Sequence, residues 1–309
     1  MVMRIASLLP SATEIAFALG LGDQVVAVSH ECDYPPEAAK RPVLTKSTIH
    51  GKIHASHEVD EEVAKRGGDI YEIDEKLLES LKPDLILTQE LCAVCAVSYT
   101  KVKEAARVLD GDTRIVSLEP SNLEDIVDNI RLVGKIAGRT AQAEKLTAQL
   151  SERMEKVKEK TRTVPRRARV AFLEWLRPPW IGGHWIPQMI DYAGGIDNIG
   201  TLGKPSRKVE WKEIVEYEPE IMILSPCGYD VKQVLAEVHT LSAYPNWDDI
   251  PAFRTSNIYA VNASAYFSRP GPRIVDGLEL LAHVTHPELF RGNHLSDSVR
   301  RVSPGLIKA

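Results

Sequence analysis

Two segments of the chain share one plan. Residues 77–90 (LLESLKPDLILTQE) and 213–226 (EIVEYEPEIMILSP) each contain a helical pattern, a Pro followed by an acidic residue, a short apolar run and a polar loop. Pro83 and Pro219 lack an amide proton and cannot continue a helix, and the apolar runs that follow have the length and composition of buried strands. The repeat predicts two similar α/β lobes. Their post-strand loops should open onto a shared cleft, where open α/β sheets hold their ligands.

Bulk composition limits the partners of the chain. A length of 309 residues fits about two domains. The net charge is −5, with acidic and basic residues interspersed, so there is no basic stripe to bind nucleic acid. No apolar run approaches the ~20 residues that cross a bilayer, which indicates a protein that does not span the membrane. The sequence as written shows no leader and predicts a cytoplasmic location, whereas removal of a leader would place the protein in the periplasm or elsewhere outside the cytoplasm.

A long uninterrupted helix is expected near the middle of the chain. Residues 139–162 contain no Gly or Pro, and apolar side chains recur at steps of three and four. These side chains are Ala143, Leu146, Leu150, Met154 and Val157. Because a single helix resists bending better than a flexible linker, we expect lobe motions of small amplitude. The predicted parts are an amino-terminal α/β lobe (1–137), a connecting helix (138–163), a carboxy-terminal α/β lobe (164–290) and a loosely held tail (291–309).

Local patterns give four further expectations. Ser11, with Glu14 three residues later, matches a capping box at a helix start. Residues 177–187 (RPPWIGGHWIP) are rich in Pro and Gly and are expected to form a loop. Trp175 ends a strand pattern and is expected to pack in the core. Residues 45–69 lack clean periodicity over most of their length and are interpreted as an excursion near the cleft.

Several segments together resemble one transport family. They are SLLPSATEIAFALGLGDQVVAVSHECDYPPEA, LKPDLIL, PPWIGGHW and SRPGPRIVDGLELL, in that order around the long central helix. The chain resembles the substrate-binding proteins of ABC importers whose lobes are joined by one helix (class III), and within them the cobalamin-binding branch. The resemblance implies two Rossmann-like α/β lobes with a ligand between them and no required cofactor. Ligands of the family are vitamin B12 and other corrinoids, ferric siderophores, haem or bare metals, so a binder rather than an enzyme is expected.

Two positions depart from the pattern of the cobalamin-binding branch. Those proteins dock onto their permease through a surface Glu on each lobe, and alignment places Lys76 and Lys212 there, with Glu75 and Glu213 one residue away. The loop TQELCAVC stands where the cobalamin binders carry an aromatic residue and glycines. The resemblance therefore implies a small ligand, and leaves docking onto an ABC permease an open question.

The expected cleft loops are rich in aromatic and polar side chains. Aromatic faces suit a large planar macrocycle because each buries roughly 150 to 250 Å² with little loss of rotamer entropy. His184 is a candidate axial ligand for a bound metal centre, and Arg269 and Arg273 are candidates either to hold polar ligand groups or to pair within the lobe. The candidate ligand-binding residues are Pro10, Ser11, His30, Tyr34, Glu90, Cys92, Trp180, His184, Trp185, Tyr229, Tyr266, Phe267 and Arg269.

A possible metal site is the second candidate. Cys92 and Cys95 are expected between a strand and a helix, and Cys32 with His30 lies in the loop of a neighbouring strand. Three thiolates and one imidazole form an acceptable tetrahedral set for zinc, and soft thiolates also suit copper(I) or cobalt. The alternatives are half-buried structural thiols or a redox or chelatase-like enzyme that uses the Cys-x-x-Cys loop. The leading hypothesis from the sequence remains capture of a corrinoid such as cobalamin, with a metal or metal-chelate binder as the alternative.

Overall fold

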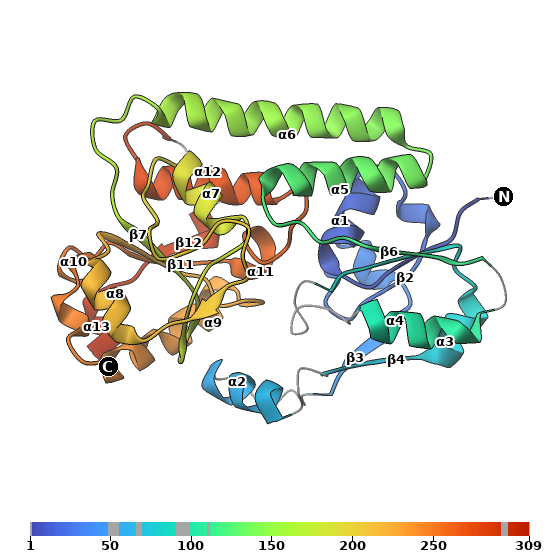
Figure 1. The fold of residues 1–309 in the computed structure, drawn as a ribbon, viewed down its shortest axis with the longest axis horizontal. Helices are drawn as coiled ribbons and strands as arrows, with labels where there is room; N and C mark the ends of the chain where they lie inside the picture. Colours follow the sequence, from blue (N-terminus) through green and yellow to red (C-terminus); the bar gives the residue numbers. More distant parts are fainter. Residues whose placement is uncertain are drawn as a thin grey trace.

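The computed structural model describes residues 2–48, 56–65, 70–90, 99–109, 112–291 and 296–308. Figure 1 shows two α/β lobes side by side, with the helix α6 (Thr140–Thr161) running across both. None of the helices in these ranges has the length and apolar composition that would let it cross a membrane. The predicted fold class, two α/β lobes joined by one long helix, is confirmed.

The amino-terminal lobe is built on a four-stranded sheet with the order β2-β1-β5-β6, in which all neighbours are parallel. Strands β3 and β4 form a separate antiparallel pair. The elements are β1 (Ile5–Ser7), α1 (Pro10–Ala18), η1 (Gly22–Gln24), β2 (Val25–Val28), η2 (Ala38–Lys40), β3 (Thr45–Ser47), α2 (Ser56–Lys65), β4 (Tyr71–Ile73), α3 (Glu75–Leu81), β5 (Leu85–Thr88), α4 (Tyr99–Ala105), η3 (Ala106–Val108), β6 (Arg114–Ser117) and α5 (Leu123–Ile136).

The carboxy-terminal lobe is built on a six-stranded sheet with the order β12-β11-β10-β7-β8-β9. Its central strands β7, β10 and β11 are parallel, and the outer strands are antiparallel to their neighbours. The elements are β7 (Val170–Leu176), β8 (Pro179–Ile181), α7 (Ile186–Tyr192), β9 (Arg207–Lys208), α8 (Trp211–Tyr217), β10 (Ile221–Leu224), α9 (Val231–Glu237), η4 (Val238–Ala243), η5 (Trp247–Asp249), α10 (Pro251–Arg254), β11 (Ile258–Val261), α11 (Ala263–Tyr266), α12 (Ile274–Thr285), η6 (Ser296–Ser298), β12 (Val299–Arg301) and α13 (Pro304–Lys308).

The internal repeat of the sequence is a repeat of structure. Helices α3 and α8 both end at a left-handed residue, Lys82 with φ 44° and Glu218 with φ 50°. Each is followed by a proline, whose ring disfavours a helical conformation in the residue before it. The chain then enters β5 or β10, each a fully buried strand of four residues. The local chemistry around Pro83 and Pro219 thus sets the same helix-to-strand transition twice.

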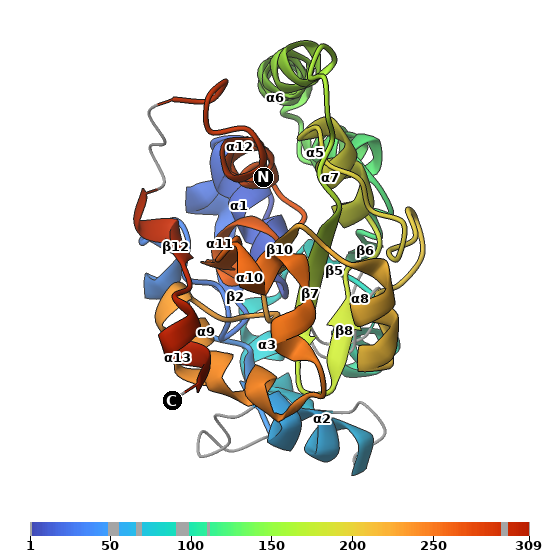
Figure 2. The ribbon, with the colours of Figure 1, turned by 90° about the vertical axis from the view of Figure 1, so that its left-hand side faces the viewer.

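Helix α6 packs on both lobes through one seam. Its buried side chains follow helical spacing and are Ala143, Thr147, Leu150, Met154, Val157 and Thr161. It packs against α5 of the first lobe and against α12 and α7 of the second, as Figures 1 and 2 show. One apolar core runs beneath it and includes Ile5 of the first lobe and Phe172 of the second. The connector is therefore part of the packing of both lobes.

The carboxy-terminal segment differs from the expected loose tail. Strand β12 pairs antiparallel with β11, and α13 packs on η4. The side chains of Val302 and Ile307 are completely buried. The expectation was wrong for residues 296–308 because β12 covers the edge of β11 that would otherwise present unpaired backbone groups.

Two local expectations were also wrong. Helix α1 begins at Pro10 after the N-cap residue Leu9, and no side chain caps it, so Ser11 lies inside the helix rather than at a capping box. The segment expected as a loop contains the strand β8, which pairs with β7 and β9. Pro179 is tolerated because it is the first residue of that strand.

Candidate functional site

Two adjoining cavities lie between the lobes. The first, which we call the polar cavity, has a volume of about 210 Å³ and is lined by Leu9, Pro10, Ser11, Glu31, Tyr71, Gln89, Cys227, Gly228, Tyr229, Gln233, Ser264, Ser268, Arg269 and Pro270. The second, the aromatic cavity, has a volume of about 350 Å³ and is lined by Val59, Asp60, Val63, Gln89, Glu174, Trp175, Trp180, His184, Trp185, Pro205, Ser206, Cys227, Phe267, Ser268 and Pro270. Four residues line both cavities, so the two form one continuous cleft.

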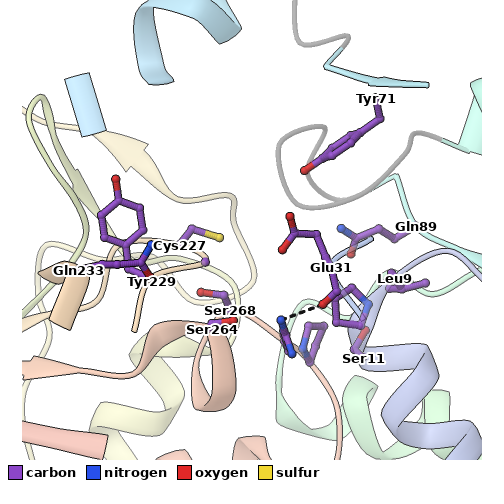
Figure 3. A pocket seen from close by; sticks show the side chains of 14 residues that line it. Leu9, Ser11, Glu31, Tyr71, Gln89, Cys227, Tyr229, Gln233, Ser264 and Ser268 are labelled. Atoms are coloured by element: carbon purple, nitrogen blue, oxygen red, sulfur yellow. Dashed lines mark hydrogen bonds between the residues drawn. The ribbon is translucent and has the colours of Figure 1, made fainter. Parts of the chain in front are cut away.

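The repeat positions the centre of this cleft. Gln89 directly follows β5, and Cys227 follows β10 after two residues. Both side chains line both cavities, and they approach the cleft from opposite lobes (Figure 3). The expectation that the loops after the repeated strands open onto one cleft is confirmed for Gln89 and Cys227, whereas residues 91–98 of the first loop lie outside the described residues.

The second lobe supplies an aromatic wall. Trp175 of β7 lies opposite Trp180 of β8 in the strand register, and both are half-buried and line the aromatic cavity. Trp185 and Phe267 lie deeper, and the indole Nε1 of Trp185 donates to the carbonyl oxygen of Phe267 at 3.0 Å. Trp175 was expected in the core; it packs against the apolar core of the second lobe but stays half-buried and lines the aromatic cavity. A register shift in the β7–β8 pairing next to this residue explains the difference, because such irregularities re-aim side chains.

Helix α2 of the first lobe also contributes to the cleft. Its residues Val59, Asp60 and Val63 line the aromatic cavity, and the helix contacts β7 of the other lobe. In Figure 1 it lies below the gap between the lobes. The expectation of an excursion near the cleft is confirmed for this helix. His50 and His54 lie outside the described residues, as does the side chain of His57.

His184 has an unusual backbone and a ring at the aromatic cavity. Its φ is 48°, in the left-handed region. The turn is held by hydrogen bonds from its amide to the Lys204 carbonyl at 2.6 Å and from the Gly203 amide to its own carbonyl at 3.0 Å. The imidazole stacks on Trp185 with ring centroids 5.6 Å apart. Burial lowers the pKa of His184, which favours the neutral ring.

The two arginines singled out in the sequence connect the lobes to each other. Arg273 donates to both carboxylate oxygens of Glu14, at 2.9 and 2.6 Å. Arg269 donates to the carbonyl oxygen of Glu31 at 3.0 Å and pairs with the carboxylate of Asp33. Burial raises the pKa of Glu14 although both guanidinium groups oppose that change. The expected pairing within one lobe is replaced by pairing between the lobes, and a role of these arginines in holding polar ligand groups stays a prediction.

Some candidates do not line either cavity. His30 hydrogen-bonds Thr45 through Nδ1 at 2.7 Å, with its ring 5.2 Å from that of Tyr71. Tyr34 is exposed and lies under the Arg273 guanidinium at 3.8 Å, and Tyr266 contacts the same group at 5.7 Å. Glu90 is exposed and accepts from Thr100 at 3.2 Å. These side chains surround the cleft rather than form its described lining.

Of the three cysteines in the predicted metal site, the structure describes only Cys32. Cys32 lies in the apolar core of the first lobe, where its sulfur is 3.1 Å from Oγ1 of Thr13 and 3.2 Å from Oγ of Ser29. Burial raises the pKa of this thiol, which disfavours the thiolate that a metal would need. Cys92 and Cys95 lie outside the described residues. Within the described ranges, no group of three or more His, Cys, Asp or Glu side chains is arranged to hold a metal ion.

Acidic groups dominate the charge of the cleft lining. Glu31, Asp60 and Glu174 line it, and the only guanidinium or ammonium among the described lining residues is Arg269. The donors of Arg269 are already directed to Glu31, Asp33 and, at 3.8 Å, Glu14. The described lining therefore offers aromatic faces, amides and hydroxyls, with no uncommitted positive charge.

A family model for periplasmic binding proteins matches residues 5–265. The chain belongs to the periplasmic binding protein family. It is therefore a non-enzymatic binding protein of an ABC importer, whose partners are a small ligand and a permease. The resemblance noted in the sequence is confirmed.

Relatives of this periplasmic binding protein are similar along most of their length. The vitamin B12-binding protein of Vibrio cholerae serotype O1 is 26% identical over 279 residues, which cover 89% of this chain and 86% of the relative. The ABC transporter substrate-binding lipoprotein YvrC of Bacillus subtilis is 25% identical over 303 residues, covering 93% and 81%.

Solved structures show the same fold. The periplasmic heme-binding protein RhuT from Roseiflexus sp. RS-1 has a TM-score of 0.69 at 24% identity and covers 93% of this chain and 99% of its own. The periplasmic vitamin B12 binding protein BtuF of Vibrio cholerae has a TM-score of 0.65 at 22% identity and covers 92% and 96%. Proteins named for different ligands thus share this two-lobed architecture, and the ligand must be argued from the cleft.

Proposed function

We propose that this periplasmic binding protein captures a corrinoid, cobalamin or a close relative, in the cleft between its lobes and delivers it to an ABC permease. The aromatic wall of Trp175 and Trp180 offers flat apolar faces to the macrocycle. The adjoining polar cavity offers amide and hydroxyl groups from Gln89, Gln233 and Ser268 for hydrogen bonds to the ring's substituents.

The charge of the cleft carries the proposal. The side chains of a corrin ring are neutral carboxamides, whereas haem bears two carboxylates and catecholate siderophores form anionic ferric complexes. Burying an anion without a cationic partner is costly. The described lining has three carboxylates, and its one guanidinium is already paired. A neutral amide-bearing macrocycle fits this lining better than an anionic one does. The vitamin B12-binding relatives, at about 26% identity, are consistent with this choice.

Equilibrium titration tests the ligand class. We expect cyanocobalamin and dicyanocobinamide to bind saturably at micromolar protein in isothermal titration calorimetry, with one site per chain. Hemin should bind at least about tenfold more weakly, a difference of ~1.4 kcal/mol. Saturable binding of hemin at micromolar protein together with no heat from either corrinoid would reject the proposal.

Docking onto the permease is proposed to use the exposed start of α3 and the equivalent start of α8. Glu75 is exposed there, whereas Glu213 is paired with Arg207. The neighbours Lys76 and Lys212 are exposed, and Lys212 pairs with Glu216 at 3.4 Å. We expect Glu75→Ala to weaken capture by the reconstituted permease more than the matched change Glu79→Ala on the same helix. Equal effects of the two changes would remove Glu75 from the docking surface.

The relatives described as periplasmic proteins or lipoproteins favour an extracytoplasmic location for this capture step.

A further inference from the structure

His184 has a backbone conformation that is uncommon for a residue other than glycine, with a φ of 48°. A residue other than glycine at positive φ is strained, and such strain is characteristic of functional positions. The strain is maintained by the segment 203–206. Besides the two backbone bonds to Lys204 and Gly203, the hydroxyl of Ser206 accepts from the Gly183 amide at 3.2 Å.

The turn also leaves no space for a side chain at either glycine before His184. A Cβ added to Gly183 would lie 2.3 Å from the Lys204 carbonyl oxygen. A Cβ on Gly182 would lie 2.8 Å from a methyl carbon of Ile186. Gly183 is therefore required for the close approach of the segment 203–206, and Gly182 for the packing of the turn against Ile186. The close approach at Gly183 holds the backbone of His184 beside the aromatic wall.

The imidazole itself is not used in the structure. Neither ring nitrogen has a hydrogen-bond or ionic partner among the residues that the structure describes. His184 lines the aromatic cavity, and its ring stacks on Trp185. It is partly desolvated, and its lowered pKa keeps the nitrogen lone pair free near neutral pH. A neutral, oriented imidazole at an apolar cavity is a donor for a transition-metal centre.

We infer that His184 coordinates the central metal of the bound macrocycle, which makes this chain selective for corrinoids with an exchangeable axial position. The inference rests on the proposed function. With a cobalt(III) corrinoid that carries water on the axial face, the Co–O bond breaks, the water leaves, and a Co–N bond forms with the lone pair of the ring nitrogen. Cobalt keeps its oxidation state, and a neutral ring releases no proton in this exchange. A corrinoid without an exchangeable axial ligand binds through the aromatic and polar walls alone.

Absorption spectra of bound diaquocobinamide test this coordination at pH 7.5. At saturation with the wild-type protein, the bands should shift to the positions that the same corrinoid shows in concentrated free imidazole. In His184→Gly, which suits the left-handed backbone, the bound spectrum should stay that of the same corrinoid free in buffer at this pH, and added imidazole should restore the shift. His184→Asn, which also tolerates this backbone, should likewise lose the shift.

Affinity and a matched control complete the test. We expect His184→Gly to bind diaquocobinamide about tenfold more weakly and to bind dicyanocobinamide, whose axial positions are filled, as well as the wild type does. His239→Asn, an exposed histidine outside both cavities, should change neither spectrum nor affinity. A wild-type spectrum identical to free diaquocobinamide, or a shift that survives in both His184 variants, would overturn the coordination. Dicyanocobinamide distinguishes failure of the coordination from failure of the proposed function, because it needs no coordination by His184. If it does not bind, the proposed function itself is rejected.

Discussion

At the scale of single residues, Glu14 carries the ionic contact between the lobes. Its carboxylate is almost completely buried and is held by the Nε and Nη2 groups of Arg273. The Nη1 atom of Arg269 lies 3.8 Å from Oε1 of the same carboxylate. Breaking one partner of a buried pair is costly because the other charge is left unpaired. The lobe interface therefore depends on Arg273 more than on any exposed ion pair of the surface.

Arg273→Met should destabilise the protein by about 3–5 kcal/mol at pH 7.5. The loss should be smaller near pH 4. Removing the guanidinium removes the main opposition to desolvation, so the pKa of Glu14 rises further above its unfolded value. Between the pKa of Glu14 in the unfolded chain and its higher pKa in the folded variant, the folded state binds more protons than the unfolded state. The stability of the variant therefore falls as pH rises through this range. Urea denaturation of variant and wild type at both pH values measures the difference.

The double variant Glu14→Gln/Arg273→Met is the control for that experiment. It has no carboxyl group at this position, so its loss of stability should be smaller and independent of pH over this range. Equal losses for the single variant at pH 4 and pH 7.5 would contradict the assignment of Glu14 as the group responsible.

The half-buried Trp180 of the aromatic wall gives a second prediction at this scale. Trp180→Ala should lower affinity for cyanocobalamin about tenfold, because stacking and buried area are both lost. Trp247, half-buried against Phe253 and outside both cavities, is the matched control. Calorimetric titration should show an unchanged dissociation constant for Trp247→Ala. Similar losses of affinity in both variants would indicate a general effect on folding instead of a contact with ligand.

At the scale of elements, the sequence predicts what is local or repeated and misses what depends on distant partners. The repeat around Pro83 and Pro219 predicts two lobes and a common cleft, and helical spacing predicts α6. The strand β12 could not be predicted, because its stability depends on the edge of β11. The cleft position of Trp175 depends on a register shift between β7 and β8 that no local pattern encodes. Gln89 and Cys227 were detectable, since each follows a repeated strand.

The carboxy-terminal segment provides a test with adjacent residues. The side chain of Ile307 is fully buried, whereas that of Leu306 is 47% exposed. Ile307→Ala should lower the free energy of unfolding by about 2–5 kcal/mol, and Leu306→Ala by much less. Chemical denaturation measures both variants. A negligible effect of Ile307→Ala would restore the interpretation of this segment as a loosely held tail.

The contact between α5 and α6 gives a second test of an element. A Cβ at Gly134 would lie 2.4 Å from the Cβ of Ala143 and 3.1 Å from the Arg139 carbonyl oxygen. Gly134→Ala should therefore destabilise by about 1–3 kcal/mol, despite the better helix propensity of Ala. Adding Ala143→Gly should recover part of the loss, because it removes the closer of the two clashes. Strictly additive losses in a double-mutant cycle would show that the two positions are not in contact.

At the scale of the whole molecule, the lobes share one apolar core, a buried ionic contact and a helix packed on both. Gln188 of α7 adds a further link, accepting from the Leu123 amide at 2.8 Å. Two lobes joined in this way are held more rigidly than lobes joined by a flexible linker. We therefore expect motions of one lobe against the other to be of small amplitude. Small-angle scattering profiles with and without cyanocobalamin should nearly coincide. A marked decrease in the radius of gyration on binding would contradict this expectation.

The central claim is that a corrinoid is held between the two lobes, and a crystal structure of the protein with cyanocobalamin tests it most directly. We expect one ligand per chain, with the ring against Trp180 and its amides within hydrogen-bond distance of Gln89 or Gln233. The protein backbone should match the free structure to within about 1 Å. A cleft that stays empty at saturating cyanocobalamin, or a ligand bound away from both Trp180 and Gln89, would contradict the account.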